Sequence, residues 1–287
     1  MLEQILFIVW RESVEAILVV GIAYAWLRRA EARTGLRYLW LGVVGGLLLA
    51  GIMGAALMGA GSWLQGAAQE LFQAAMVLIA CVLIVQMVVW MRAHGRTLKM
   101  ELERGLSDSV TQARYWGIAL LVAIAVAREG AETVVFLYGM GMARWHSGAM
   151  GEFLAAATAG FALALVTFGL LQLGSRLFSW RVFFRITETL LLLLAASLFV
   201  SGLERLINLG VLPAGPDPVW DTSAWLDDGT GVGALLASFA GYRAWPAFTV
   251  VSGYLAYWLV VFGLLGWQRR HEARPRPTLK ERKEPVG

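Results

Sequence analysis

Residues 2–27 read LEQILFIVWRESVEAILVVGIAYAWL, and this stretch decides the class of fold. It is apolar for longer than the roughly 20 residues that a helix needs to cross a bilayer. It is not a cleavable signal peptide, because Glu3 stands where a basic region is required and the apolar part is too long. Arg11, Glu12 and Glu15 lie near its middle. The stretch therefore predicts a transmembrane helix that carries charges at membrane depth.

The whole chain has the composition of a membrane protein. Of its 287 residues 59% are hydrophobic and 15% are charged, against about 25% charged in soluble domains. We expect an all-α integral membrane protein with seven transmembrane helices in one domain, residues 1–267. Residues 203–244 form a long outer connection with a short helix or re-entrant segment near 231–240, and 268–287 form a basic tail that we expect to be disordered. The expected spans are approximately 2–27, 38–60, 71–91, 115–142, 152–174, 182–202 and 245–267.

Basic residues are concentrated in alternate connections, which indicates the orientation. The connections after spans 1, 3 and 5 and the C-terminal tail hold most of them, whereas the others hold only Arg144, Arg205 and Arg243. This asymmetry predicts an N-terminus outside and a C-terminus in the cytoplasm, which requires an odd number of spans. The net charge of +4 is then a topology signal, and we expect no nucleic-acid partner.

The charged pattern of the first span recurs in the fourth. Residues 11–15 read RESVE and residues 128–132 read REGAE, so both are R-E-x-x-E motifs near the middle of a span. On a helix the Arg and the second Glu share one face, and the two Glu are neighbours. A charge at this depth costs about 2.5–3.5 kcal/mol, so both motifs should face the protein interior. Buried salt bridges between helices would need only one Glu per Arg, and the surplus carboxylates favour a bound cation instead.

The two motifs also predict an internal symmetry. Three spans separate their starts, so the first and fourth spans run in opposite directions. Spans 1–3 and 4–6 would form an inverted repeat, with the seventh helix outside it and the ion site at the repeat interface near the midplane.

The inventory of other side chains narrows the class of site. His94, His146 and His271 all lie outside the spans, which disfavours a membrane haem enzyme. All five Asp also lie in connections, which disfavours an intramembrane aspartyl protease, so we do not expect an enzyme. Carboxylates suit calcium, magnesium, manganese or iron. A single cysteine, Cys81, disfavours a soft-metal site, although Met140 and Met142 keep that alternative open.

At this point the motifs resemble a known family. Two R-E-x-x-E motifs in spans 1 and 4 of seven resemble the oxidase-dependent iron permease family of the iron/lead transporter superfamily. It includes the fungal high-affinity iron permease and the bacterial EfeU-type iron transporters. A second region supports the resemblance, because residues 220–223 (WDTS), 233–236 (GALL), 241–242 (GY) and Pro246 look like the outer loop and last span of bacterial members.

The resemblance implies high-affinity iron import through the bacterial cytoplasmic (inner) membrane. Iron, as Fe³⁺ or Fe²⁺, is then the transported substrate, with no bound organic cofactor. The expected partners are the lipid bilayer and a separate extracytoplasmic oxidase or iron-binding protein. A transporter of manganese or lead, or a membrane assembly protein without transport, remain alternatives.

By the same resemblance four glutamates are translocation ligands, and two arginines orient them and offset their charge. The glutamates are Glu12, Glu15, Glu129 and Glu132, and the arginines are Arg11 and Arg128. The chain departs from the family pattern at Ser13, where fungal members have Gly. It departs again near Gln73, where an acid is expected and Glu70 stands one turn earlier.

Several other residues have two interpretations. Glu70 is either an outer ligand or an acid that stabilises a helix N-terminus. Glu188 is either an inner exit site for the ion or, as we favour, the local partner of a snorkelling Arg185. Asp221 either attracts cations at the outer mouth or caps a turn. Aromatic residues at span ends are interpreted as an interfacial belt; they include Trp26, Tyr38, Trp90, Tyr115, Trp116 and Trp267.

Overall fold

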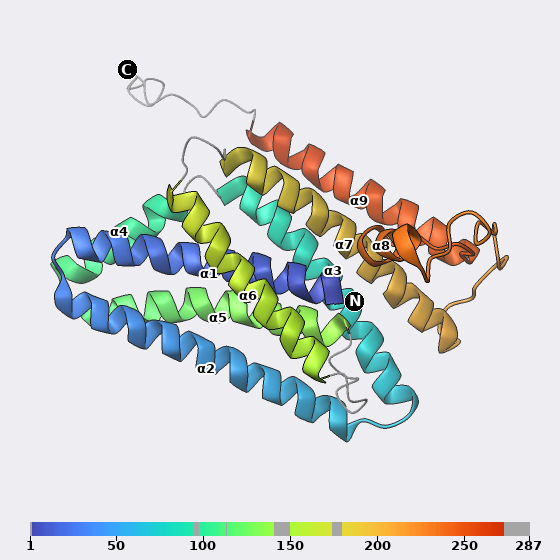
Figure 1. Ribbon diagram of the computed structural model, residues 1–287, viewed down its shortest axis with the longest axis horizontal. Helices are drawn as coiled ribbons and strands as arrows, with labels where there is room; N and C mark the ends of the chain where they lie inside the picture. The colour runs from blue at the N-terminus through green and yellow to red at the C-terminus, as the bar shows by residue number, and fades with distance from the viewer. Residues whose placement is uncertain (1, 95–97, 113, 141–149, 174–179, 273–287) are drawn as a thin grey trace, which may run out of the picture.

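The computed structural model describes residues 2–94, 98–112, 114–140, 150–173 and 180–272. Within these ranges it contains nine helices and no strand (Figure 1). The helices are α1 (Leu2–Arg29), α2 (Arg33–Trp63), α3 (Ala67–His94), α4 (Leu98–Thr111), α5 (Tyr115–Met140), α6 (Met150–Leu173), α7 (Trp180–Asn208), α8 (Gly231–Ala240) and α9 (Phe248–Glu272).

The long helices have the properties of membrane spans. By length and composition five of them can cross a bilayer, namely α2, α3, α6, α7 and α9. Helices α1 and α5 are as long, at 28 and 26 residues, but contain the charged motifs. Helix α2 also exposes a broad apolar surface that includes Leu47, Leu48 and Ile52, as expected of a side that faces lipid. The all-α membrane class is confirmed, and the count of seven spans stays a prediction.

Several helix boundaries differ from the expected ones, and three of them border the outer connection or the tail. Helix α7 continues beyond residue 202 to Asn208, because its last turns are fixed by an Arg243–Glu204 ion pair and by a hydrogen bond from Arg205 to Gln73. Helix α9 begins at Phe248, after a segment whose carbonyls accept hydrogen bonds from the outer connection. It continues to Glu272, so residues 268–272 of the expected disordered tail are helical, and 273–287 lie outside the described residues.

Two short helices complete the bundle. Helix α8 occupies the stretch 231–240 for which a short helix was one expectation, and it packs on α7. Helix α4 lies in a connection for which no helix was expected. It packs on α1 and α5 through Leu102 and Leu106, which are buried, while its polar face is exposed. The pattern is that of an amphipathic surface helix.

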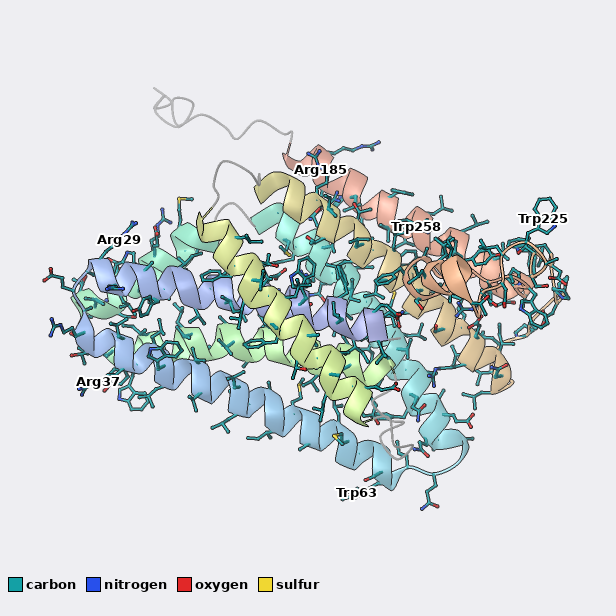
Figure 2. All side chains as sticks on the ribbon, in the orientation of Figure 1. Arg29, Arg37, Trp63, Arg185, Trp225 and Trp258 are labelled. Atoms are coloured by element: carbon teal, nitrogen blue, oxygen red, sulfur yellow. The ribbon has the colours of Figure 1, made fainter. Side chains whose placement is uncertain are left out.

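The packing brings α1, α3 and α5 together in the centre. Helix α2 lies along α5, α6 lies across α1, and α3 lies along α7 (Figure 1). Helix α1 runs antiparallel to α5 and contacts it directly. The C-terminal ends of α1 and α6 then lie toward the opposite end of the bundle from the connection after α2. Figure 2 shows Arg29 and Arg37 at one end and Trp63 at the other.

Small residues set the distance between α2 and α5. On α2 the buried positions facing α5 include Gly42, Gly46 and Ala50, at intervals of four residues. A Cβ atom at Gly46 would lie 2.7 Å from the Cβ of Val126 and 2.8 Å from a carbonyl oxygen of α5. A Cβ at Gly130, in the second motif, would lie 2.5 Å from that of Ala50. Close contact through small residues is typical of membrane helices, and here it places one side of the second motif against α2.

Candidate metal centre

The two R-E-x-x-E motifs lie in the protein interior where α1 meets α5. Arg11 is 3% exposed, Glu12 is 2% exposed and Glu129 is 9% exposed. On α1 the first motif shares its buried face with Ile8 and Val14. These three charged side chains are therefore removed from the lipid-facing surface, as the cost of a charge at membrane depth requires.

Three carboxylates converge at this point. One oxygen each from Glu12, Glu15 and Glu129 lies within 4.8 Å of the other two. Oxygen ligands on opposite sides of an ion at about 2.3–2.6 Å are themselves up to about 5 Å apart, so the spacing fits one hard cation. We call these three carboxylates the first site.

Buried oxygen atoms without partners mark the same region. The Oε2 atoms of Glu12, Glu129 and Glu132 are buried, and none of the residues that the structure describes donates a hydrogen bond to them. A buried polar atom without a partner is costly, and far more so when it is charged. A cation would supply the missing interaction, and the donor set of carboxylates fits such an ion.

Arg11 is held on several sides. Its Nη1 lies 2.6 Å from Glu12 Oε1, and its Nη2 lies 2.5 Å from Glu15 Oε1. The same nitrogens donate to thioether sulfurs of α3, at 2.6 Å to Met87 Sδ and 3.1 Å to Met91 Sδ. The Arg–Glu pairing at i,i+4 agrees with the helix geometry expected of the motif. Arg11 thus fixes two ligands of the first site and ties them to α3.

Arg128 has different surroundings from Arg11. Its Nε donates to Glu132 Oε1 at 3.1 Å, and its side chain is 39% exposed. Its guanidinium lies over the ring of Trp90, 4.4 Å from the ring centroid, a cation–π contact of the kind that contributes about 0.5–2 kcal/mol. The second arginine is therefore attached to α3 by an aromatic ring and to its own motif by one hydrogen bond.

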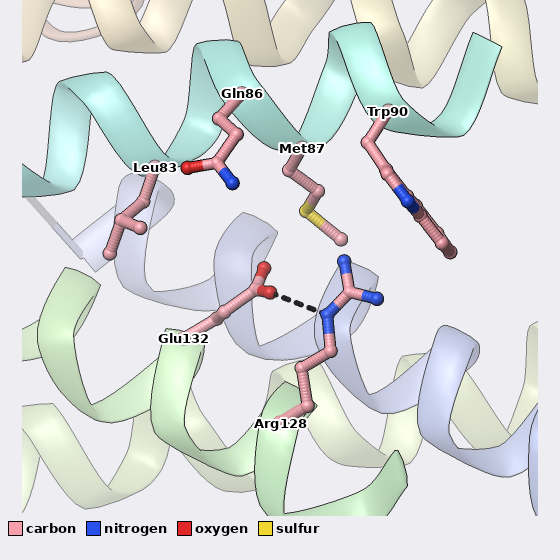
Figure 3. A pocket seen from close by; sticks show the side chains of 6 residues that line it. All are labelled: Leu83, Gln86, Met87, Trp90, Arg128 and Glu132. Carbon is pink, nitrogen blue, oxygen red and sulfur yellow. Dashed lines mark hydrogen bonds and ion pairs between the residues drawn. The ribbon is translucent and has the colours of Figure 1, made fainter. Parts of the chain in front are cut away.

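A cavity adjoins this pair. It has a volume of about 280 Å³ and lies between α3 and α5. Figure 3 shows the amide nitrogen of Gln86 on the side that faces Glu132, and Met87 to one side of both, above Arg128. The residues that line it are Leu83, Gln86, Met87, Trp90, Arg128 and Glu132.

Helix α3 is the part of this region that sequence reasoning missed. Trp90 was assigned to the interfacial belt, and the structure also places its ring against the guanidinium of Arg128. Gln86 was an available signal, because it is a polar residue in an otherwise apolar segment. Met87 and Met91 carried no signal, because methionine is ordinary in a buried helix.

The remaining candidates lie away from the first site. Glu70 is exposed in the first turn of α3, as an acid at a helix start would be. Glu188 pairs with Arg92 of α3, Nε to Oε2 at 2.9 Å. The partner that was expected, Arg185, is exposed. Where an acid was expected in α3, Gln73 accepts a hydrogen bond from Arg205 at 2.9 Å.

Asp221 caps a turn in the outer connection. Its Oδ1 accepts hydrogen bonds from the backbone N–H and the hydroxyl of Ser223, at 2.9 and 2.6 Å. These bonds lower the pKa of Asp221 below its ordinary value. The side chain is exposed, so of the two interpretations this geometry favours the cap.

Comparison with known proteins places the chain in a family. The profile of the iron permease FTR1 family matches residues 2–268. The ferrous iron permease EfeU of Escherichia coli O157:H7 is 29% identical over 272 residues, which cover 90% of this chain and 94% of the relative. The ferrous iron permease EfeU of Yersinia pestis is 27% identical over 253 residues, which cover 87% and 88%.

No solved structure matches the chain. The sequence relationship nevertheless covers both motifs and all seven long helices, and it confirms the resemblance that the motifs indicate. The chain belongs to the iron permease FTR1 family.

Proposed function

We propose that this protein imports iron across the bacterial inner membrane and that Glu12, Glu15, Glu129 and Glu132 pass the ion across the midplane. The observation that carries the proposal is the first site. There, three carboxylate oxygens from α1 and α5, two helices that are far apart in the sequence, lie within 4.8 Å of one another. The identity of the metal is supported by the family and by the names of the relatives, which are ferrous iron permeases.

The charge balance of the two motifs favours a cation. Four carboxylates and two guanidiniums give a formal charge of −2 when all six are ionised. Carboxylates crowded in a dry interior repel one another strongly. Iron entering the first site offsets this charge, and Arg11 holds Glu12 and Glu15 in place between ions.

The helix contacts support the proposed inverted repeat. In the inverted repeat, α1 corresponds to α5, α2 to α6 and α3 to α7. The contact between α2 and α5 then corresponds to the contact between α6 and α1, and both contacts are extensive. The α1–α5 and α3–α7 contacts convert into themselves. The first site then lies on the symmetry axis between the two halves, where alternating access is commonly organised. A separate extracytoplasmic oxidase or iron-binding protein would deliver the ion to the outer end.

Uptake of radioactive iron by membrane vesicles tests this function. Glu12→Gln and Glu129→Gln preserve side-chain size and remove the charge, and each should lower uptake at least about a hundredfold, since a charged ligand is lost from a buried site. Glu101→Gln is the matched control, because Glu101 is exposed on α4. Uptake at the control level in both variants, with normal membrane insertion, would refute the proposal.

A further inference from the structure

Glu132 stands apart from the other three motif glutamates. It is absent from the group of converging oxygens in the first site, and it lines the neighbouring cavity instead. Its Oε1 accepts from Arg128, while its Oε2 is buried without a hydrogen-bond donor. The carboxylates of Glu12, Glu15 and Glu129 all repel it. Its free oxygen and the surrounding negative charge both favour a cation in the cavity.

Gln86 supplies a second oxygen on the opposite wall. It is exposed and continues the outward stripe of α3 that includes Ile79 and Val82. An amide at this depth cannot be satisfied by lipid, whereas the two neighbouring side chains on the stripe are aliphatic. In Figure 3 the amide nitrogen points toward Glu132 and the amide oxygen toward Leu83. Rotation of the amide by half a turn exchanges the two atoms and brings the oxygen to the side of Glu132. Carboxylate and amide oxygens are both ligands of hard cations.

The cavity is large enough for a hydrated ion. Its volume of about 280 Å³ far exceeds the roughly 10–15 Å³ that a single water molecule needs. A divalent cation that keeps several of its waters, as small hard cations do, fits between the two walls. The remaining waters would bridge the ion to side chains that it does not touch directly.

Arg128 is arranged so that Glu132 can change partner. Its guanidinium rests on the ring of Trp90 as well as on Glu132. When a cation binds the carboxylate of Glu132 in place of Arg128, the arginine keeps its contact with the ring of Trp90 and stays at the edge of the cavity. Arg11 has no such freedom, because it is buried between two glutamates and two methionines.

We propose that the cavity between α3 and α5 is a second cation site, formed by Glu132 and Gln86, in which a partly hydrated divalent metal ion binds separately from the first site. This second site rests on the proposed function, since its ion is the transported one. In this arrangement three of the motif glutamates bind the ion in the first site. The fourth, Glu132, binds it in the second site together with Gln86 of α3.

Thiol labelling tests the second site without a transport assay. The chain has one cysteine, Cys81, so Cys81→Ala gives a cysteine-free background. In it, Gln86→Cys places a thiol in the cavity, and Val82→Cys places one on the same stripe outside the lining. With a small charged methanethiosulfonate on opened membranes, we expect labelling at least about tenfold faster at position 86, because lipid excludes the reagent at position 82.

Protection by Mn²⁺ then reports the ion itself. For this test the thiol is placed by Leu83→Cys, because Leu83 lines the cavity and its replacement leaves Glu132 and Gln86 in place. Mn²⁺ should slow its labelling at least about fivefold, since a hard cation bound by the two ligands occupies the cavity. Added Glu132→Gln should abolish the protection, and added Glu12→Gln should leave it. Equal labelling at positions 82 and 86, labelling at neither, or protection that survives Glu132→Gln would overturn the second site.

Uptake separates this inference from the proposed function. With folding checked by gel filtration, Gln86→Leu should lower the maximal rate of iron uptake about tenfold, because one ligand of a hydrated ion is lost. If uptake depends on Glu12 and Glu129 while Gln86→Leu behaves as the parent protein, the second site is wrong and the proposed function stands. If no variant affects uptake, the proposed function fails.

Discussion

The two motif arginines occupy equivalent places in the sequence but different places in the molecule. Arg11 is 3% exposed and pairs with two carboxylates, whereas the side chain of Arg128 is 39% exposed and pairs with one. Burial rather than motif position decides what each contributes to stability, because removing one partner of a buried ion pair leaves an uncompensated charge.

Arg11→Leu should therefore destabilise the protein strongly. Without the guanidinium, Glu12 and Glu15 lose their partner, and the free energy of unfolding should fall by about 3–5 kcal/mol. Arg128→Leu should have a much smaller effect, because the Arg128 side chain is 39% exposed and pairs with only one carboxylate. Thermal unfolding in detergent measures both variants, and equal losses would show that the two surroundings do not differ as described.

Glu188→Gln tests whether this residue is an exit site or a partner. Its ion pair with Arg92 is partly exposed, at 14% and 28% for the two side chains. Loss of a mostly buried, charge-assisted hydrogen bond costs about 1–3 kcal/mol, so the variant should be less stable but should keep more than about half of the uptake rate. A large loss of uptake in a stable variant would instead make Glu188 part of the ion path.

Asp221→Asn separates the two interpretations of the outer connection. The hydrogen bonds from Ser223 mark Asp221 as a turn cap with a lowered pKa. Asparagine also accepts in such turns, so iron uptake by the variant at neutral pH should match the parent protein. A rise in the iron concentration needed for half-maximal uptake would contradict this and assign Asp221 to cation capture.

At the scale of helices, the sequence predicts where helices form better than it predicts which helices pack against each other. The apolar runs and the motif spacing predict that α1 and α5 turn charged faces inward, because any other arrangement exposes charge to lipid. They do not predict that Met87, Trp90 and Met91 of α3 contact the arginines. These side chains are ordinary in a membrane helix, and their role depends on which helix packs beside which.

The contact between α2 and α5 offers a matched pair of glycine substitutions. At Gly46 a Cβ would meet α5 at 2.7–3.0 Å, whereas at Gly51 nothing lies within 4 Å. Gly46→Ala should push α2 away from α5, disturb the second motif through Gly130 and Ala50, and lower thermal stability. Gly51→Ala should be neutral or stabilising by up to about 1 kcal/mol, because alanine favours the helix. Equal melting temperatures would contradict the close α2–α5 contact.

At the scale of the whole molecule, pattern alone indicates seven long helices but not what lies between them. Helix α4 was not expected, because its mixed polar sequence has neither the length nor the hydropathy of a span. Its burial of Leu102 and Leu106 depends on a groove that exists only after α1 and α5 have packed. Elements whose apolar face is small become predictable only when their partner surface is known.

The orientation of the bundle is the remaining prediction at this scale. Arg29 and Arg37 lie at one end and Trp63 at the opposite end (Figure 2), and a basic end is normally cytoplasmic. Green fluorescent protein fused after residue 287 should then fluoresce, and alkaline phosphatase fused there should be inactive. Alkaline phosphatase inserted after Asp228, in the exposed outer connection, should be active. The reverse pattern would show that the molecule has the opposite orientation in the membrane. The glutamates would then pass the ion in the opposite direction.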